Sequence, residues 1–450
     1  MGNYSKILVV VLGIAFLLLL VLKCKLHAFI ALLIASIGVG IASGMSLGDI
    51  SSSIQNGMGG TLGSVAIVVG LGAIFGQLLE ESGGAQSLAT AMIRKLGDKR
   101  APLAFALTGF VIAIPVFFDV GFIILLPLIF AVANKTKKSV ATYAFPLIIA
   151  LCITNAFVPP TPGPVATTGA LGANMGYVIL FGIIISIPLT IIGYIYSIKY
   201  IDRKVMIPVP EYVVIEERDD KNLPSFGNVI FIIAVPILLI LANTGVEALI
   251  SSGIIKESFF TSVVKFLGTS YVALLIAVLL SFYSLGKKRG FHKEDLLEIS
   301  SKAFTPVGLI MLVTGAGGVF KQILLDSGVG DIIAAVVTEF GLPVILLGYI
   351  VAAFIRVSQG SGMVAMITAA GIVNPIIMAA PVSEMQKALI VLAIAAGSVM
   401  ASHVNDSGFW LVCKYLNMTE GQTLKTWTLI TTVLSLCALL FVSLLSVVVG

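Results

Sequence analysis

The chain has 450 residues, of which 58% are hydrophobic and only 11% are charged, and its formal net charge is +5. A soluble domain carries roughly a quarter charged residues, so this composition excludes an ordinary soluble protein. Many apolar stretches approach or exceed the ~18–20 residues that cross a bilayer as a helix. We therefore expect an all-α polytopic membrane protein with about 12 membrane segments, for example at 7–22, 28–42 and 426–449.

The first apolar stretch, 7–22, lacks the small-residue site at which signal peptides are cleaved, which predicts a membrane span. The four cysteines are far apart, and none forms a C-x-x-C pair, so neither a metal site nor a disulfide framework is expected. A primary pump would need a nucleotide site, and the sequence has no GxxxxGK[ST] motif.

Basic residues gather in a few loops. Residues 94–100 hold four of them, 135–138 hold three, and 287–293 hold four, while the long polar segment 201–226 holds four basic and six acidic residues. Lysine and arginine accumulate in cytoplasmic loops, so we expect these segments in the cytoplasm and the loop at 45–60, which has no basic residue, outside.

Two segments of the chain repeat each other. Residues 72–83 match 317–328 at six of twelve positions, with a constant offset of 245. Four basic residues follow within 84–100, whereas 329–342 contain none, so the two copies should face opposite sides of the membrane. This pattern predicts an inverted-topology repeat, a construction found in secondary transporters. The expected division is an N-terminal half at 1–200, a cytoplasmic linker at 201–226 and a C-terminal half at 227–450.

Each half contains two places where an apolar run is interrupted by polar residues, glycine or proline: 115–122 and 154–169, then 355–363 and 402–409. Proline lacks an N–H and disfavours helix in the residue before it, so the helix must open at these points. Broken backbone at membrane depth is tolerated only where it is buried in protein or lines a wet cavity. The N-termini of half-helices carry partial positive charge, so the breaks predict re-entrant hairpins around a binding site for a carboxylate.

Polar or small residues at the breaks are candidates for substrate binding: Asn155, Thr161, Gly163, Arg356, Gln359, Gly360, Ser361, Asn405 and Ser407. A guanidinium can hold a carboxylate with two hydrogen bonds, although Arg356 could instead pair with a nearby aspartate. Candidates for proton coupling are Asp119, His403 and Asp406, because these groups titrate or are costly to leave charged in a membrane. The competing roles are helix caps and structural hydrogen bonds.

Two other classes of protein are less consistent with the sequence. A channel would not need paired broken helices, which favour alternating access. An intramembrane hydrolase could be built on Ser361 and His403, but no catalytic signature such as GxSxG or HExxH is present.

Three motifs, at 117–130, 156–166 and 403–410, together resemble the gluconate permease family, inner-membrane symporters of sugar acids and other small hydroxy acids. The resemblance runs over nearly the whole chain. It implies two inverted halves with re-entrant hairpins, a homodimer and an elevator-type movement. Gluconate transporters often have histidine where this chain has Asn155 and Thr161, which leaves glycerate, 3-hydroxybutyrate and D-serine open as substrates.

The resulting hypothesis is a proton-coupled symporter, not an enzyme, for gluconate or a related small hydroxylated monocarboxylate. Its partners would be a small organic anion, membrane lipid and a second copy of the chain, with no nucleic acid and no cofactor other than the coupling proton. We expect a multi-pass protein of the cytoplasmic membrane.

Overall fold

The computed structural model describes residues 23–201, 205–209, 223–305, 307–328, 343–379 and 382–449, together with isolated positions between 9 and 20. Every regular element in these ranges is helical. Half of the predicted first span at 7–22, much of the linker 201–226 and all of the segment 329–342 lie outside the described residues.

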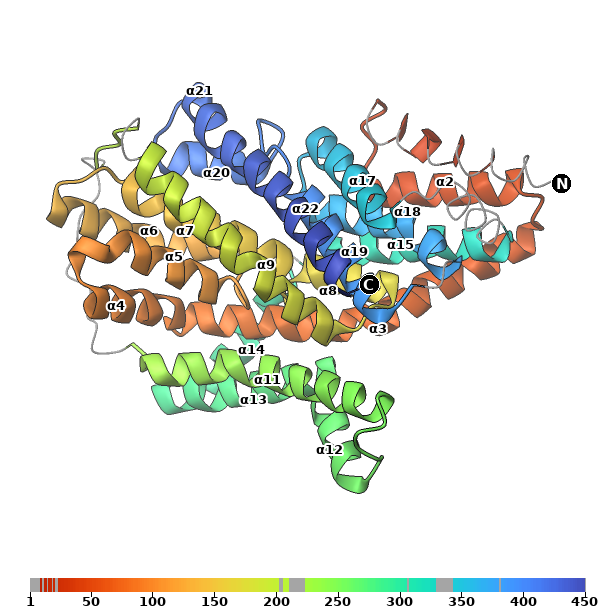
Figure 1. Ribbon diagram of the computed structural model, residues 1–450, viewed down its shortest axis with the longest axis horizontal. Helices are drawn as coiled ribbons and strands as arrows, with labels where there is room; N and C mark the ends of the chain where they lie inside the picture. Colours follow the sequence, from red (N-terminus) through yellow and green to blue (C-terminus); the bar gives the residue numbers. More distant parts are fainter. Residues whose placement is uncertain are drawn as a thin grey trace.

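The helices of the first half are α2 (Ala28–Ala42), α3 (Leu47–Glu81), α4 (Gly84–Leu96), α5 (Ala101–Ile112), α6 (Phe118–Thr136), α7 (Ala141–Phe157), α8 (Pro162–Leu171) and α9 (Met175–Tyr196). Those of the second half are α11 (Phe226–Ser251), α12 (Phe259–Leu267), α13 (Ser270–Ser281), α14 (Lys293–Ala303), α15 (Val307–Asp326), α17 (Val344–Gln359), α18 (Gly362–Ala379), α19 (Glu384–Ser398), α20 (Ser407–Tyr415), α21 (Glu420–Thr423) and α22 (Leu429–Val449). Figure 1 shows that most of the long helices run roughly along one common direction.

Eight helical runs within the described ranges are long and apolar enough to cross a membrane. Shorter apolar helices such as Ala28–Ala42 and Val344–Gln359 add to them without reaching that length. The all-α membrane architecture predicted from the sequence is therefore confirmed, whereas the number of about 12 segments stays a prediction.

All four predicted interruptions are breaks between helices. At the first interruption, 115–122, α5 has already ended at Ile112 and α6 begins at Phe118, and within 154–169, α7 ends and α8 begins at Pro162. Within 355–363, α17 ends and α18 begins at Gly362, and within 402–409, α20 begins at Ser407 after α19 has ended. Each break is thus followed by a new helix N-terminus.

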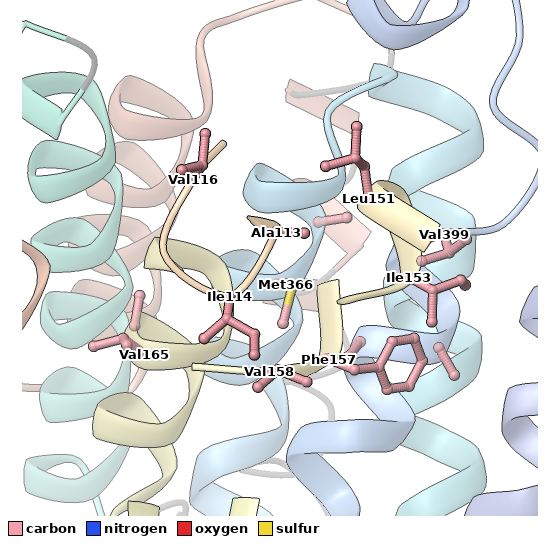
Figure 2. Packing of buried hydrophobic residues seen from close by; sticks show 14 of the residues in the cluster. Ala113, Ile114, Val116, Leu151, Ile153, Phe157, Val158, Val165, Met366 and Val399 are labelled. Carbon is pink, nitrogen blue, oxygen red and sulfur yellow. The ribbon is translucent and has the colours of Figure 1, made fainter. Parts of the chain in front are cut away.

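The backbone of the two breaks of the first half lies largely in the interior of the protein. Helices α7 and α19 are apolar on nearly every face and almost completely buried, as expected for helices surrounded by other helices. Figure 2 shows Ile114 and Val158, from the two breaks of the first half, close to Met366 of α18. Buried apolar side chains therefore shield this irregular backbone from lipid, which is the condition under which it is tolerated.

The two copies of the sequence repeat end in the same local structure. Ser82 N–H donates to Leu78 O at 3.1 Å, and Ser327 N–H donates to Ile323 O at 3.0 Å, at the same offset in both copies. Each copy then ends in a glycine with positive φ, Gly83 at 72° and Gly328 at 64°. Glycine is favoured there because a side chain would be strained in the left-handed region.

The helices that contain these copies, α3 and α15, pack against each other in antiparallel orientation. Ser53 near the start of α3 donates to Asp326 at the end of α15, at 2.5 Å, whereas Gly70 lies toward Phe304, just before α15 begins. The two copies therefore point in opposite directions along the molecule.

The described parts of the basic and linker segments meet at one end of the protein. Arg289 of the 287–293 loop donates to the carbonyl of Ser82 at the end of α3. Ser139, which follows the 135–138 loop, donates to Val205 O at 3.0 Å, and Ser87 donates to Pro224 O. In Figure 1 these segments lie at the left end of the molecule, and the loop between α2 and α3 lies at the right end.

Candidate functional site

A cavity of about 160 Å³ lies where the four breaks meet. Its wall includes the first turns of α6, α8, α18 and α20, which follow the four breaks, and residues of α7, α17 and α19, which precede three of them. The lining residues are Phe118, Asp119, Cys152, Asn155, Ala156, Gly163, Pro164, Arg356, Gly362, Met363, Met366, Ser398, Val399, Asp406, Ser407, Gly408 and Trp427.

Four helix N-termini therefore share one small space. The first N–H groups of a helix have no partner within the helix, and its N-terminus carries the equivalent of roughly +0.5 charge. The local sequence explains where two of these helices begin. Asp406 caps α20 by accepting from Gly408 N–H at 3.1 Å, and Pro162 occupies the first position of α8, where a missing N–H costs nothing. The arrangement favours a bound anion.

An ion pair forms one side of the cavity. Arg356, near the end of α17, donates from Nη2 to Oδ2 of Asp406, and the two side chains are only 8% and 10% exposed. Ser402 Oγ donates to the same carboxylate oxygen, and Trp427 Nε1 donates to Ser402 Oγ at 2.8 Å. The carboxylate of Asp406 thus accepts from a guanidinium, a hydroxyl and a main-chain N–H.

The guanidinium of Arg356 is only partly satisfied by this pair. Its Nε and Nη1 atoms are buried and have no hydrogen-bond partner among the described residues. Unsatisfied buried donors are rare, particularly on a charged group, because leaving them without a partner is costly. Since Arg356 lines the cavity, an anion bound there could accept from these two atoms.

A second carboxylate faces the same cavity without a partner. Asp119 lies in the first turn of α6 and makes no hydrogen bond or ion pair with any described residue. Its neighbour Phe118 stacks on Trp427, with 5.8 Å between the ring centroids. The cavity therefore combines one arginine and two aspartates with an aromatic wall.

Of the twelve residues predicted from the sequence, six line the cavity: Asp119, Asn155, Gly163, Arg356, Asp406 and Ser407. Asn155 lies two residues before the end of α7, and its Nδ2 donates to Val116 O in the first break at a long 3.4 Å. Gly163 lies against Met366, because an added Cβ would come within 3.0 Å of the methionine sulfur.

The other six, Thr161, Gln359, Gly360, Ser361, His403 and Asn405, are not among the lining residues. His403 Nε2 and Asn405 Nδ2 lie 2.9 and 2.7 Å from the carbonyl of Val357, near the C-terminus of α17. Thr161 Oγ1 lies 2.8 and 2.9 Å from the carbonyls of Asn155 and Val158. In this structure these three side chains satisfy backbone groups left open by the breaks.

Gly360 and Ser361 form the turn between α17 and α18, and Gln359 is the last residue of α17. Gly360 has a φ of 85°, and an added Cβ would lie 2.0 Å from the carbonyl oxygen of Asn405. Ser361 Oγ accepts from Val364 N–H at 3.3 Å, as a helix cap does. The third and fourth breaks therefore lie in direct contact.

Several lining residues were not predicted from the sequence. Cys152 lies three positions before Asn155 and four before Ala156, and these spacings would have been enough to place it on the same side of α7 as both. Met363 and Met366 share a face of α18 for the same reason. Trp427 comes from a segment outside all four breaks, so no local signal connects it with the cavity.

Comparison with known proteins gives a consistent result. A family model described as GntP family permease matches residues 5–448 of this chain. The low-affinity gluconate transporter of Escherichia coli strain K12 is 38% identical over 434 residues, which cover 96% of each protein. The gluconate permease of Bacillus subtilis strain 168 is 37% identical and covers 98% of this chain and 100% of its own length. Inner membrane permease YgbN of E. coli strain K12 is also 37% identical, covering 96% of this chain and 97% of that protein.

The fold is also found in a solved structure. Neisseria gonorrhoeae MtrF, described as one of a class of antimetabolite efflux pumps, aligns with a TM-score of 0.67 over 96% of this chain and 94% of its own. The two sequences are 16% identical, so the similarity shows a shared fold.

Proposed function

Because this chain belongs to the GntP family of permeases, we propose that it is a secondary active symporter that couples proton entry to the import of gluconate or a related small hydroxylated monocarboxylate. The chain is a transporter and not an enzyme, and it is a multi-pass protein of the cytoplasmic membrane.

The single observation that carries the substrate assignment is the unsatisfied guanidinium at the meeting point of four helix N-termini. Arg356 Nε and Nη1 are two buried donors on one charged group, and each could donate to an oxygen of a bound anion. The surrounding N-termini of α6, α8, α18 and α20 add partial positive charge. A monocarboxylate would therefore bind with its charged end at Arg356.

The hydroxyl groups of the substrate would bond to the polar side chains Asn155 and Ser407 and to free main-chain groups of the breaks. Glycine at positions 163, 362 and 408 lets a ligand approach the backbone closely. Gluconate is the best supported substrate, because similar proteins are named gluconate transporter or gluconate permease. Glycerate, 3-hydroxybutyrate and D-serine are the alternatives within the same class of small hydroxylated acids.

We assign the proton to Asp119. Asp406 is paired with Arg356 and bonded to Ser402 and a main-chain N–H, and His403 is bonded to a carbonyl outside the cavity. Asp119 has no such partner among the described residues, and a lone carboxylate at membrane depth is costly when charged. Its protonation would lower the net charge of the cavity when the substrate anion enters.

We further propose that residues 1–200 and 227–450 form inverted-topology halves joined by the linker 201–226, with about 12 membrane segments in total when half-helices are counted. The antiparallel packing of α3 and α15 supports this arrangement. Each half supplies two of the four breaks, so movement of the broken helices against α3 and α15 would open the cavity to one side at a time. Homodimer formation also belongs to this proposal.

The experiment is counterflow in liposomes containing the purified full-length protein. Liposomes loaded with unlabelled gluconate are diluted into a trace of radiolabelled gluconate, and the four candidate acids are compared as external competitors. We expect transient accumulation of label, with gluconate the strongest competitor. If another of the four acids competes best, that acid becomes the assigned substrate. Absence of counterflow with all four acids would contradict the proposed carrier for this class of substrate.

A further inference from the structure

Helix α12 (Phe259–Leu267) carries a large apolar surface that no other part of the described protein covers. Phe259, Phe260 and Phe266 are 86%, 75% and 62% exposed, and Val263 between them is 36% exposed. These four residues lie on one side of the helix, because they are spaced by one, three and four positions. Three exposed phenylalanines on one short helix are unusual for a surface that contacts water.

The opposite side of α12 faces the protein. Thr261 is buried, and Gly268, just after the helix, lies so close to α11 that an added Cβ would be 2.3 Å from Leu239 O. Ser258 and Thr261 form a reciprocal capping box at the N-terminus of α12. The helix is therefore fixed in orientation, and its phenylalanine side points away from the molecule.

The direction of α12 differs from that of the membrane-spanning helices. It connects the end of α11 with the start of α13, and in Figure 1 it lies roughly perpendicular to both, below the right-hand part of α11. A helix in this position runs parallel to the membrane plane where the spans end. Amphipathic helices with this orientation and with phenylalanine on the apolar side lie in the interface between lipid headgroups and acyl chains.

The spans that adjoin α12 also expose apolar side chains. Leu238 and Leu249 of α11 are 62% and 40% exposed, and Leu275 of α13 is 45% exposed. Lys256, before the helix, is exposed, and Lys265, in the last turn of the helix, pairs with Glu257 at 3.2 Å. Lysine beside an apolar helix face is suited to the phosphate groups of phospholipids.

We propose that α12 is an interfacial helix that inserts its phenylalanine side into the phospholipid boundary, on the face of the membrane opposite to the basic loops. It anchors the α11–α13 hairpin at a fixed depth. This inference depends on the membrane location of the chain and is independent of which substrate is transported.

The test is photo-crosslinking of the full-length protein in liposomes of phosphatidylethanolamine and phosphatidylglycerol. Benzoylphenylalanine replaces Phe260, and in a control variant it replaces Glu294, an exposed residue of α14. After irradiation, mass spectrometry should detect a phospholipid adduct on the variant at position 260, several-fold more abundant than in the control. A covalent dimer of the chain would instead show that a second copy covers α12, and equal lipid labelling of both variants would also overturn the proposal.

A second variant tests the role of the aromatic side chains. Phe259, Phe260 and Phe266 are replaced together by serine, and the photoreactive residue is placed at Val263. Because these side chains point outward, the protein should keep its helix content and elute as before in detergent, while the lipid adduct falls several-fold. Loss of folding would show that the phenylalanines pack internally, and an unchanged adduct would show that they do not drive insertion; either result would contradict the proposal.

Discussion

At the scale of single residues, charge balance in the cavity depends on one arginine and two aspartates. Arg356 is shared between Asp406, which it contacts, and an anion that its two remaining buried donors could hold. Removing one partner of a buried ion pair leaves an uncompensated charge, which is more costly than removing both. Comparing a variant that lacks one partner of the pair with a variant that lacks both therefore separates the contribution of Arg356 to stability from its contribution to substrate binding.

The first prediction concerns Arg356→Gln. We expect the free energy of unfolding to fall by about 3–5 kcal/mol, because Asp406 is left buried without its cation. The half-saturating substrate concentration in counterflow should rise about ten-fold or more, since a hydrogen bond to a charged group is worth ~1.5–3 kcal/mol. Thermal unfolding in detergent and counterflow kinetics measure the two effects.

The matched control is the double variant Arg356→Gln with Asp406→Asn. Removal of both charges should restore most of the thermal stability without restoring substrate affinity. Arg356→Lys should keep the ion pair but weaken binding, because lysine lacks the planar pair of donors. Normal affinity in any variant that lacks the arginine would show that Arg356 does not bind the carboxylate.

The second prediction concerns Asp119→Asn. If Asp119 carries the proton, this variant should lose gradient-driven accumulation of substrate while retaining at least part of its counterflow, which needs no net proton movement. Asp98→Asn is the control, because Asp98 is 42% exposed and pairs with Lys135 on the surface. Accumulation by Asp119→Asn equal to that of the unchanged protein would assign the proton to another group.

At the scale of elements, the breaks keep their shape through contacts with each other. The carbonyl of Val357, near the end of α17, is bonded to His403 and Asn405 from the fourth break. Gly360 fits directly against Asn405. The shapes of the third and fourth breaks therefore depend on each other.

The third prediction compares two glycines that have nearly the same φ. Gly360→Ala should lower the unfolding temperature and reduce transport, because the methyl group would lie 2.0 Å from Asn405 O in addition to the cost of positive φ. Gly290→Ala is the control, since Gly290 has a φ of 88° and no atom within 4 Å of an added Cβ. Equal losses in both variants would show that the contact between the breaks is unimportant.

The sequence predicts the elements of this site better than the roles of its residues. All four breaks could be located because proline, glycine and polar side chains within apolar runs act through local chemistry. Whether a side chain near a break faces the cavity is decided by tertiary packing, which is why Arg356 and Asp406 line it while His403 and Thr161 bond to backbone carbonyls. Apolar lining residues such as Met366 and Trp427 have no feature in the sequence that separates a cavity wall from a core.

At the scale of the whole molecule, the arrangement of the charged loops and of the two repeat copies decides the topology. The basic loops gather at one end through contacts such as Arg289 with Ser82, and α3 and α15 run in opposite directions. The charge difference that predicted the inversion involves 329–342, which lies outside the described residues, so the inversion itself stays a proposal.

The fourth prediction tests this topology. In a Cys24→Ser background, which removes the one exposed cysteine among the described residues, single cysteines are placed at the exposed positions Asp49 and Lys99. A membrane-impermeant maleimide applied from outside should label position 49 and should reach position 99 only after permeabilisation. Labelling of both positions from the same side would contradict the assignment of the loops.

The central claim is that a carrier of this architecture uses a proton gradient to concentrate a small hydroxylated monocarboxylate. The most direct measurement is uptake of radiolabelled gluconate by liposomes that contain the purified protein, with an inward proton gradient imposed. We expect accumulation above the external concentration, and its collapse when a protonophore is added. Uptake that only equilibrates, or that is the same with and without the gradient, would contradict the account.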